Sequence, residues 1–455
     1  MECAQCAPLF LPARIRESAQ KPMNTGPSLK TKSGRVVRVL MVVENCPYSR
    51  DPRVRKEARA LTDAGYRVSV ICPRHGAGPA KPPQNVHVHE FPLWSSTRTG
   101  LGYLVEYSYG MMAIVLLSLW VLAREGFDII HVANPPDCII PVLSFYKLFG
   151  KPIIYDQHDL SPELYAAKFG GNRWICRLLL AIERYSCLLA DHIIVTNESY
   201  KELSLQRCST PESKITVVRN GPDLEMLDVP KINAELRSKS RNIIAFAGVT
   251  GMQDGLDVLC RALHYLRYEL HAEDFYCIVL GDGDALDATK RLAEEVGIAD
   301  RIQFAGWVDD PALYSSYIAT ADICVAPEPF NNYNDRSTFV KIMEYMSAGK
   351  PIVAFDLRET RRSAEGAALY ARVNDVKDFA QKIATFIARP ELRESMGRIG
   401  RQRIGQELAW DYSTPGLLSA YQQVASQFSK STTPVHPLIG DAFRKRVSLA
   451  ADKKA

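Results

Sequence analysis

Short apolar runs alternate with longer amphipathic segments from residue 36 onward. Six runs rich in Ile and Val come first, at residues 36–43, 67–72, 128–132, 152–155, 192–196 and 215–218. Runs that are apolar on both faces are typical of central strands in a sheet covered by helices. Strand–loop–helix–strand order builds parallel sheets. The pattern therefore predicts a doubly wound α/β domain over residues 35–220.

A second series of the same kind follows. Its runs lie at residues 242–247, 276–280, 302–305, 323–326, 351–355 and 368–371, with helical segments between them. This series predicts a second Rossmann-like domain over residues 242–410. The segment 221–241, rich in Pro, Asp, Lys and Ser, is interpreted as the linker. We expect a final helix at 411–428 to pack back on the N-terminal domain.

The two ends of the chain lack this periodicity. Residues 1–34 read as a disordered leader and residues 429–455 as a basic tail. The net charge of +5 is too small to indicate nucleic-acid binding. The 11 cysteines lie partly within apolar runs, which favours reduced thiols in a cytoplasmic protein. The lone pair Cys3 and Cys6 lacks a second pair at suitable spacing, so we expect no metal site.

The longest apolar stretch covers residues 110–123. A membrane-spanning helix needs about 20 apolar residues, so this stretch should not span a bilayer. We expect a buried helix, and contact of one of its faces with lipid stays open as the alternative. No secretory signal opens the chain. The localisation predicted is cytoplasmic, with peripheral contact at the inner face of the membrane left open.

Candidate binding residues follow the strands of the second domain, where ligands of open parallel sheets bind. Gly248 and Gly251 follow the run 242–247. They would let backbone amides approach an anion at the start of the next helix, although an ordinary turn is the alternative. Gly281 and Asp282 form a tight turn after the next run, compatible with close approach of a base or ribose.

The polar loop after residue 326 leads into a helix with a distinctive set of side chains. Ser337 or Thr338 is the predicted N-cap, and Lys341 and Glu344 fall on one helix face. A hydroxyl, a cation and a carboxylate in a row are the groups that a nucleotide diphosphate requires. A solvated Lys–Glu pair is the alternative interpretation.

The motif NDRST–K–x–x–EYM–x–x–GKPIV, beginning at Asn334, resembles the donor-binding region of glycosyltransferase family 4, a retaining GT-B family. The bacterial polysaccharide-type branch is the most similar, and the likeness extends over residues 36–428. It implies transfer of a sugar from a nucleotide-diphosphate sugar to a saccharide or lipid-linked saccharide, with retention. Polysaccharide or exopolysaccharide biosynthesis is the implied pathway, and no cofactor or metal is implied.

The resemblance also assigns roles to individual residues. Glu344 would bind the donor ribose, and Ser337 and Thr338 would contact the phosphates. His158, just after the run 152–155, matches the family's histidine near the donor sugar. The loop between Asn45 and Arg53 matches the family's loop near the diphosphate and the acceptor.

Two departures from the family pattern concern charge. The first of two glutamates spaced eight positions apart would fall at Arg336, so Asp335 or a neighbouring backbone group would contact the sugar ring instead. The family's Arg and Lys that neutralise the diphosphate would fall near Val249 and Asp254. Because a buried diphosphate requires a cation, we expect Lys341 or Arg336 to supply it.

The sequence contains no convincing catalytic nucleophile. The resemblance implies that the leaving diphosphate helps to deprotonate the acceptor, and that the two domains close around the donor. A GT-B-type nucleotide-sugar epimerase and a non-catalytic nucleotide-sugar-binding or membrane-assembly protein stay open as alternatives. A nicotinamide dehydrogenase is disfavoured, since no Gly-x-Gly-x-x-Gly follows the first strand.

Overall fold

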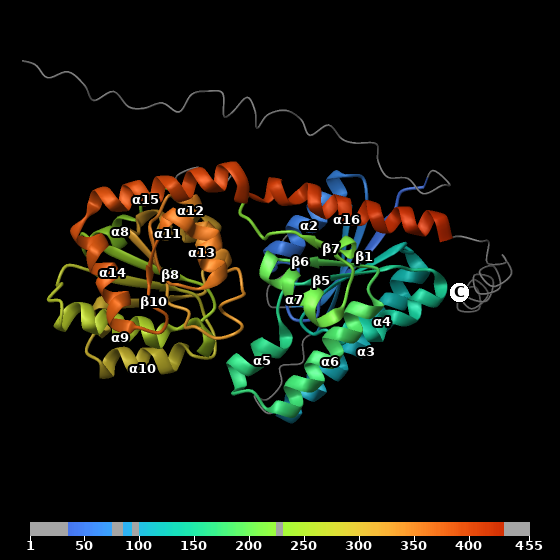
Figure 1. Ribbon diagram of the computed structural model, residues 1–455, viewed down its shortest axis with the longest axis horizontal. Helices are drawn as coiled ribbons and strands as arrows, with labels where there is room; N and C mark the ends of the chain where they lie inside the picture. The colour runs from blue at the N-terminus through green and yellow to red at the C-terminus, as the bar shows by residue number, and fades with distance from the viewer. Residues whose placement is uncertain (1–34, 75–84, 93–99, 224–230, 432–455) are drawn as a thin grey trace, which may run out of the picture.

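The chain folds into two α/β domains that lie side by side (Figure 1). The computed structural model describes residues 35–74, 85–92, 100–223 and 231–431. The predicted leader, the Cys3–Cys6 pair and most of the predicted basic tail lie outside these residues.

The N-terminal domain is built on a seven-stranded sheet in the order β3-β2-β1-β4-β5-β6-β7, and all neighbouring strands are parallel. Its strands are β1 Arg38–Val42, β2 Arg67–Arg74, β3 Val86–Pro92, β4 Ile129–Ala133, β5 Ile153–Gln157, β6 His192–Val195 and β7 Ile215–Val217. Six of them match the predicted apolar runs. The sequence analysis missed β3, because this edge strand is only partly buried and its sequence VHVHEFP is not continuously apolar.

The C-terminal domain has a six-stranded parallel sheet in the order β10-β9-β8-β11-β12-β13. Its strands are β8 Ile243–Ala247, β9 Tyr276–Leu280, β10 Ile302–Gly306, β11 Ile323–Ala326, β12 Ile352–Phe355 and β13 Ala368–Ala371. Every predicted run of this half is a strand. The prediction of two Rossmann-like doubly wound domains is therefore confirmed.

Helices cover both faces of the N-terminal sheet. They are α2 Pro52–Asp63, α3 Gly100–Arg124, α4 Ile139–Leu143, α5 Ser161–Phe169, α6 Arg173–Leu189 and α7 Glu198–Cys208, and the short 3₁₀ helix η1 Ser144–Phe149 follows α4. Residues of α3, α4, η1 and α6 share one hydrophobic cluster with the sheet, and α2 belongs to the cluster on the opposite face.

The first helix of the C-terminal domain lies within the predicted linker 221–241, where Leu236 packs into the core of this domain. The helices of the domain are α8 Ala234–Arg237, α9 Leu256–Tyr268, α10 Leu286–Glu295, α11 Pro311–Thr320, α12 Val340–Ser347, α13 Arg358–Ala364, α14 Val376–Ala388 and α15 Pro390–Arg403. The predicted N-cap of α12 is wrong. Phe339 occupies the cap position and makes no side-chain cap, whereas the Ser337 hydroxyl donates to the Tyr333 carbonyl at 2.8 Å.

The last helix, α16 Trp410–Ser431, crosses from the C-terminal domain onto the N-terminal one (Figure 1). Leu417, Ala420, Tyr421 and Val424 are buried in the cluster formed with β1 and α2. The Trp410 amide donates to the carbonyl of Pro222 at 2.9 Å. The linker and α16 therefore cross between the domains at the same place.

The structure corrects the prediction for α3, which is not a buried helix. Its segment Val105–Arg124 is long and apolar enough to cross a membrane, and only 22% of its most apolar window is buried. The apolar segment extends further toward the N-terminus than the run 110–123 suggested. Ile114 and Val121 are buried, and Ser118 hydrogen-bonds Tyr146 of η1 at 2.9 Å. These contacts hold the helix along the domain.

Candidate active site

Loops from the two domains meet at the carboxyl ends of the sheets. The Tyr333 hydroxyl, after β11, donates to Asp159 Oδ1, after β5, at 2.6 Å. The Asn197 amide, after β6, donates to Thr338 Oγ1 at 3.0 Å. The predicted site residues of both halves are therefore brought to one interdomain region, as expected for parallel sheets.

Two glycines allow β8 and β9 to approach closely at this edge. Gly248 and Gly281 have φ values of +143° and +145°, a backbone conformation that favours glycine. A Cβ on Gly281 would lie 1.8 Å from the Gly248 carbonyl oxygen, and one on Gly248 would lie 2.8 Å from Lys341 Nζ. The Lys341 ammonium group therefore lies directly against the Gly248 backbone.

Lys341 forms a buried ion pair that the sequence analysis missed. Its Nζ lies 2.5 Å from Glu328 Oε1, and their side chains are 9% and 1% exposed. The ammonium group also lies 4.1 Å from the centre of the Phe246 ring. Glu328 follows β11 by two residues, which was the available signal. The pair fixes a cation beside the glycine turn, with one carboxylate to balance it.

Glu344, one helical turn after Lys341, is half-buried. Its Oε2 accepts a hydrogen bond from the Tyr314 hydroxyl at 2.6 Å. Burial and the nearby Glu344 carboxylate raise the pKa of Tyr314 well above its ordinary value, so the phenol stays protonated and donates. Tyr314 was not predicted. It fixes one carboxylate oxygen of Glu344 and leaves the other without a partner among the described residues.

The Gly251 amide and the Asp282 carboxylate both have partners in their own turns. The Gly251 amide donates to Asp254 Oδ2 at 2.9 Å, so it is not available to an anion in this conformation. Burial raises the pKa of Asp254 to about 6, although Lys341 counteracts this shift. The exposed Asp282 accepts a hydrogen bond from the Gly283 amide at 2.7 Å, which closes its own turn.

His158 is held on both its backbone and its ring. Its amide donates to Asn134 Oδ1 at 2.6 Å, and its Nε2 lies 2.5 Å from Asp156 Oδ2. Burial alone would lower the pKa of His158, but the Asp156 carboxylate raises it above its ordinary value. The ring is therefore fixed in orientation and biased toward its protonated form. Asn134, just after β4, was not predicted.

Arg53, at the end of the loop that the resemblance placed near the diphosphate and the acceptor, is buried against partners within the protein. Its guanidinium is buried, with Nη2 at 2.7 Å from Asp156 and Nε at 3.1 Å from Glu57. The third contact is a hydrogen bond from Nη1 to the Val218 carbonyl at 2.8 Å. The predicted direct contact of Arg53 with substrate is therefore corrected: this residue balances the carboxylate that orients His158.

Three side chains of this buried network could in principle ligate a metal ion. Glu57, His131 and Asp156 place their ligand atoms within 4.8 Å of one another. The Arg53 guanidinium, however, already contacts both carboxylates. A dication beside it would be repelled, so the cluster is better suited to sharing protons than to holding a metal.

Asp335, predicted to contact the sugar ring, and Arg336, predicted as one of two candidate cations for the diphosphate, both have partners within the protein. The buried Asp335 carboxylate accepts the Arg358 amide at 2.9 Å and thereby caps α13. Arg336 instead donates from Nη1 to the Asn332 carbonyl at 3.1 Å. The predicted contact of Asp335 with the donor sugar is therefore corrected.

The predicted phosphate contacts, Ser337 and Thr338, join the two domains in this conformation. Ser337 Oγ lies 3.0 Å from the Tyr200 hydroxyl, and Thr338 is the acceptor for Asn197. Asn45, in contrast, is exposed in the loop after β1. Of the predicted residues, Gly248, Gly281 and Lys341 lie together, and Glu344 lies one turn further along the helix of Lys341.

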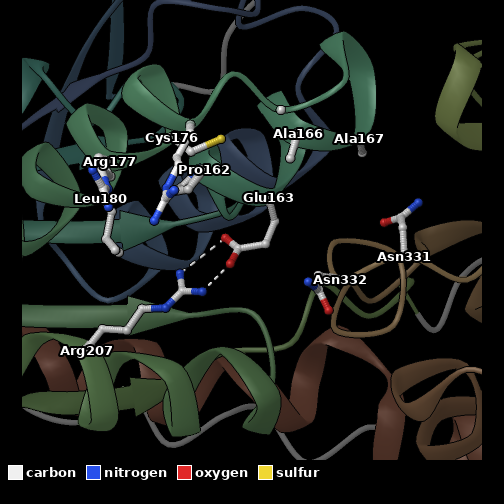
Figure 2. A pocket seen from close by; sticks show the side chains of 12 residues that line it. Pro162, Glu163, Ala166, Ala167, Cys176, Arg177, Leu180, Arg207, Asn331 and Asn332 are labelled. Carbon is white, nitrogen blue, oxygen red and sulfur yellow. Dashed lines mark hydrogen bonds and ion pairs between the residues drawn. The ribbon is translucent and has the colours of Figure 1, made fainter.

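A pocket of about 530 Å³ lies beside this region, between α5, α6, α7 and the loop of Asn331 and Asn332 (Figure 2). Glu163 and Arg207 form an ion pair within it, with Arg207 Nη1 at 3.2 Å from Glu163 Oε2. Arg173 and Arg177 also line the pocket. Its wall therefore carries more positive than negative charge.

Comparison with known families assigns each domain. Residues 53–226 match the family described as Glycosyltransferase Family 4. Residues 241–389 match the family described as Glycosyl transferases group 1. The two matches include most residues of the two sheets and the segments that carry His158, Lys341 and Glu344.

Two relatives show the extent of the similarity. The phosphatidyl-myo-inositol mannosyltransferase of Mycolicibacterium smegmatis is 24% identical over 394 residues, covering 84% of this chain and 93% of that protein. An uncharacterized glycosyltransferase of Methanocaldococcus jannaschii is 22% identical over 254 residues. The match covers 53% of this chain and 62% of the archaeal protein.

The fold is shared with solved structures. HepE of Anabaena, in complex with UDP and glucose, superimposes with a TM-score of 0.63 at 17% identity, covering 87% of this chain and all of that one. At 17% identity this similarity supports a shared fold and does not by itself indicate a shared function. With both domains matched to glycosyltransferase families, this chain is a glycosyltransferase of the GT-B type.

Proposed function

We propose that this enzyme transfers a glycosyl group from a nucleotide-diphosphate sugar to a saccharide or lipid-linked saccharide acceptor. The transfer retains the anomeric configuration, requires no cofactor or metal, and serves the assembly of a polysaccharide or other glycoconjugate. The enzyme acts in the cytoplasm.

The observation that carries the proposal is the position of Lys341. Its ammonium group occupies the space beside Gly248 that a Cβ would need, at the carboxyl ends of β8 and β9, where a nucleotide binds in this kind of sheet. A diphosphate at the glycine turn would meet this cation in a partly desolvated setting, where charge stabilisation is strong. Lys341 fits the role of the missing family cations better than Arg336, which contacts Asn332.

Glu344 and His158 complete the proposed donor site. Glu344 has one oxygen held by Tyr314, and its other oxygen would accept from the ribose hydroxyls. His158, oriented by Asp156 and Asn134, would donate to the sugar. The leaving diphosphate would take the acceptor proton, and the protein would contribute positioning and stabilisation of the departing charge.

A transfer assay tests this function. The purified enzyme is incubated with a panel of nucleotide-diphosphate sugars in the presence of EDTA, with and without saccharide and lipid-linked acceptors. We expect release of nucleoside diphosphate that depends on the acceptor, and NMR of the product should show the anomeric configuration of the donor.

Three outcomes would contradict the proposal. Conversion of the donor to an isomer without any acceptor would identify an epimerase. Inversion at the anomeric carbon would reject retention, and loss of turnover in EDTA that a divalent cation restores would reject metal independence.

A further inference from the structure

The N-terminal domain exposes large apolar side chains on α3, η1 and α6. These three segments pack their inner sides into one hydrophobic cluster against the sheet, and α4 contacts both α3 and α6. The helices α3, α4 and α6 lie along the same side of the domain (Figure 1). Their outer sides therefore belong to one face of the molecule.

Large apolar side chains on α3 and α6 point outward at helical spacing. On α3 these are Met112, Leu116 and Trp120, and Leu116 is 61% exposed. On α6, Trp174 and Leu178 are one turn apart and are 75% and 59% exposed. Large apolar side chains that gather on one exposed face mark a contact with a membrane or a partner.

The remaining members of the face share the same character. Leu148 and Phe149 extend it at the end of η1, and Tyr185 and Leu188 extend it along α6. Tryptophan and tyrosine are the side chains preferred at the boundary between lipid and water. The composition thus favours lipid headgroups over a dry protein interface.

The charge on this face is of one sign. Among the described side chains of α3, η1 and α6, the exposed charged residues are all arginines, namely Arg124, Arg173, Arg177 and Arg184. The acids of these segments, Glu106 and Glu183, are half-buried and buried. Arginine with exposed apolar and aromatic residues is the pattern of a surface that lies on an anionic bilayer.

We propose that the outer face of α3, η1 and α6 docks on an anionic lipid bilayer, with the helices lying in the interface. Arg173 and Arg177 also line the pocket beside the candidate active site. Docking through this face would therefore place that pocket at the membrane surface. Building on the proposed function, docking through this face would determine the side from which the acceptor approaches. Binding to the bilayer can be measured without any glycosyl transfer.

Vesicle flotation with the full-length protein tests the proposal. Vesicles of phosphatidylcholine alone are compared with vesicles containing phosphatidylglycerol, at low and at high salt. We expect binding to the anionic vesicles, weakened by salt because the arginines contribute electrostatically.

Two variants test separately the apolar side chains of α3 and the arginines of α6. Met112→Gln/Leu116→Gln/Trp120→Gln removes apolar contacts at exposed positions of α3. Arg173→Glu/Arg177→Glu/Arg184→Glu reverses the charge of α6. We expect each to reduce the partition coefficient onto anionic vesicles at least about 10-fold. The matched control Arg241→Glu/Lys290→Glu/Arg398→Glu changes three exposed basic residues of the C-terminal domain and should bind as the wild type does.

The proposal is overturned if the wild type does not bind anionic vesicles, or if both variants bind as tightly as it does. A wild-type dimer that the α3 variant converts to monomer would assign the face to a second copy instead. Calorimetric titration of the α3 variant with nucleotide sugars keeps the two proposals separate. Loss of vesicle binding with donor binding intact supports the docking face. Absence of donor binding in every form would contradict the proposed donor site and would leave the docking proposal unaffected.

Discussion

At the residue scale, the site depends on one buried ion pair, Lys341–Glu328. Lys341→Met would leave the Glu328 carboxylate without its cation, which should destabilise the protein by about 3 kcal/mol. It should also weaken nucleotide-sugar binding about 10-fold or more, because a charged hydrogen-bond donor is lost. Denaturant unfolding and calorimetry measure the two effects separately.

The double variant Glu328→Gln/Lys341→Met is the control for this prediction. Without a buried unpaired charge it should recover most of the lost stability, yet its donor binding should stay weak. Restored binding in the double variant would mean that Lys341 only maintains the fold.

A second prediction at this scale concerns pH. Burial and the Asp156 carboxylate raise the pKa of Glu57 to about 7, although Arg53 and His131 counteract this shift. A raised carboxyl pKa contributes stability that is present below the unfolded pKa and is lost as pH rises through the folded value. The window is thus about pH 4.5 to 7.

Glu57→Gln removes this titration. Relative to the wild type, the variant should gain about 2–3 kcal/mol of unfolding free energy between pH 5 and pH 8. Denaturant melts of both proteins at several pH values measure the change. A stability difference that does not vary with pH would show that Glu57 is ionised throughout.

The sequence could predict which residues lie near the site. It could not predict which side chains they contact there. Gly248, Gly281 and Lys341 follow from strand ends and helix spacing, which are local patterns. The partner of Lys341 lies 13 residues away across a loop, and the Arg53 guanidinium, on α2, contacts Asp156 of β5. Local sequence does not determine which way the Lys341 and Arg53 side chains point, so the sequence analysis missed both ion pairs.

At the scale of the elements, the apolar runs identified the strands because central parallel strands are buried on both faces. The edge strand β3 lacks that signal. The apolar run 110–123 located α3 but not its full length, Gly100–Arg124, and the exposed side of the helix could not be predicted from the sequence. Apolar residues on all sides of a helix are compatible with a buried helix and with one that faces lipid.

The helix α16 offers a test at the scale of the element. Leu417 is fully buried between α16 and the N-terminal core, so Leu417→Ala should cost about 2–5 kcal/mol. The exposed Gln422 on the same helix provides the control, and Gln422→Ala should change stability by less than about 0.5 kcal/mol. Equal effects of the two substitutions in denaturant melts would mean that α16 does not pack as described.

At the scale of the whole molecule, hydrogen bonds between the domains hold the cleft in its present conformation. Tyr333→Phe removes the bond to Asp159, worth about 1 kcal/mol, so the ratio of closed to open molecules should fall about 5-fold. Small-angle X-ray scattering should then give a larger radius of gyration without donor, and donor should reduce it.

Tyr412→Phe is the matched control for this closure. The Tyr412 hydroxyl donates to the Gly405 carbonyl within the C-terminal half of the chain, so this variant should scatter as the wild type does. Identical radii for all three proteins, with and without donor, would contradict domain closure.

The central claim is that a nucleotide-diphosphate sugar binds at the carboxyl ends of β8 and β9, between Lys341 and Glu344. Calorimetric titration of the wild type, Glu344→Gln and the exposed control Glu394→Gln with nucleoside diphosphates and their sugars tests it most directly. We predict that one nucleotide sugar binds the wild type and Glu394→Gln equally, and Glu344→Gln at least about 10-fold more weakly. Absence of binding by every nucleotide, or equal binding by all three proteins, would contradict the account.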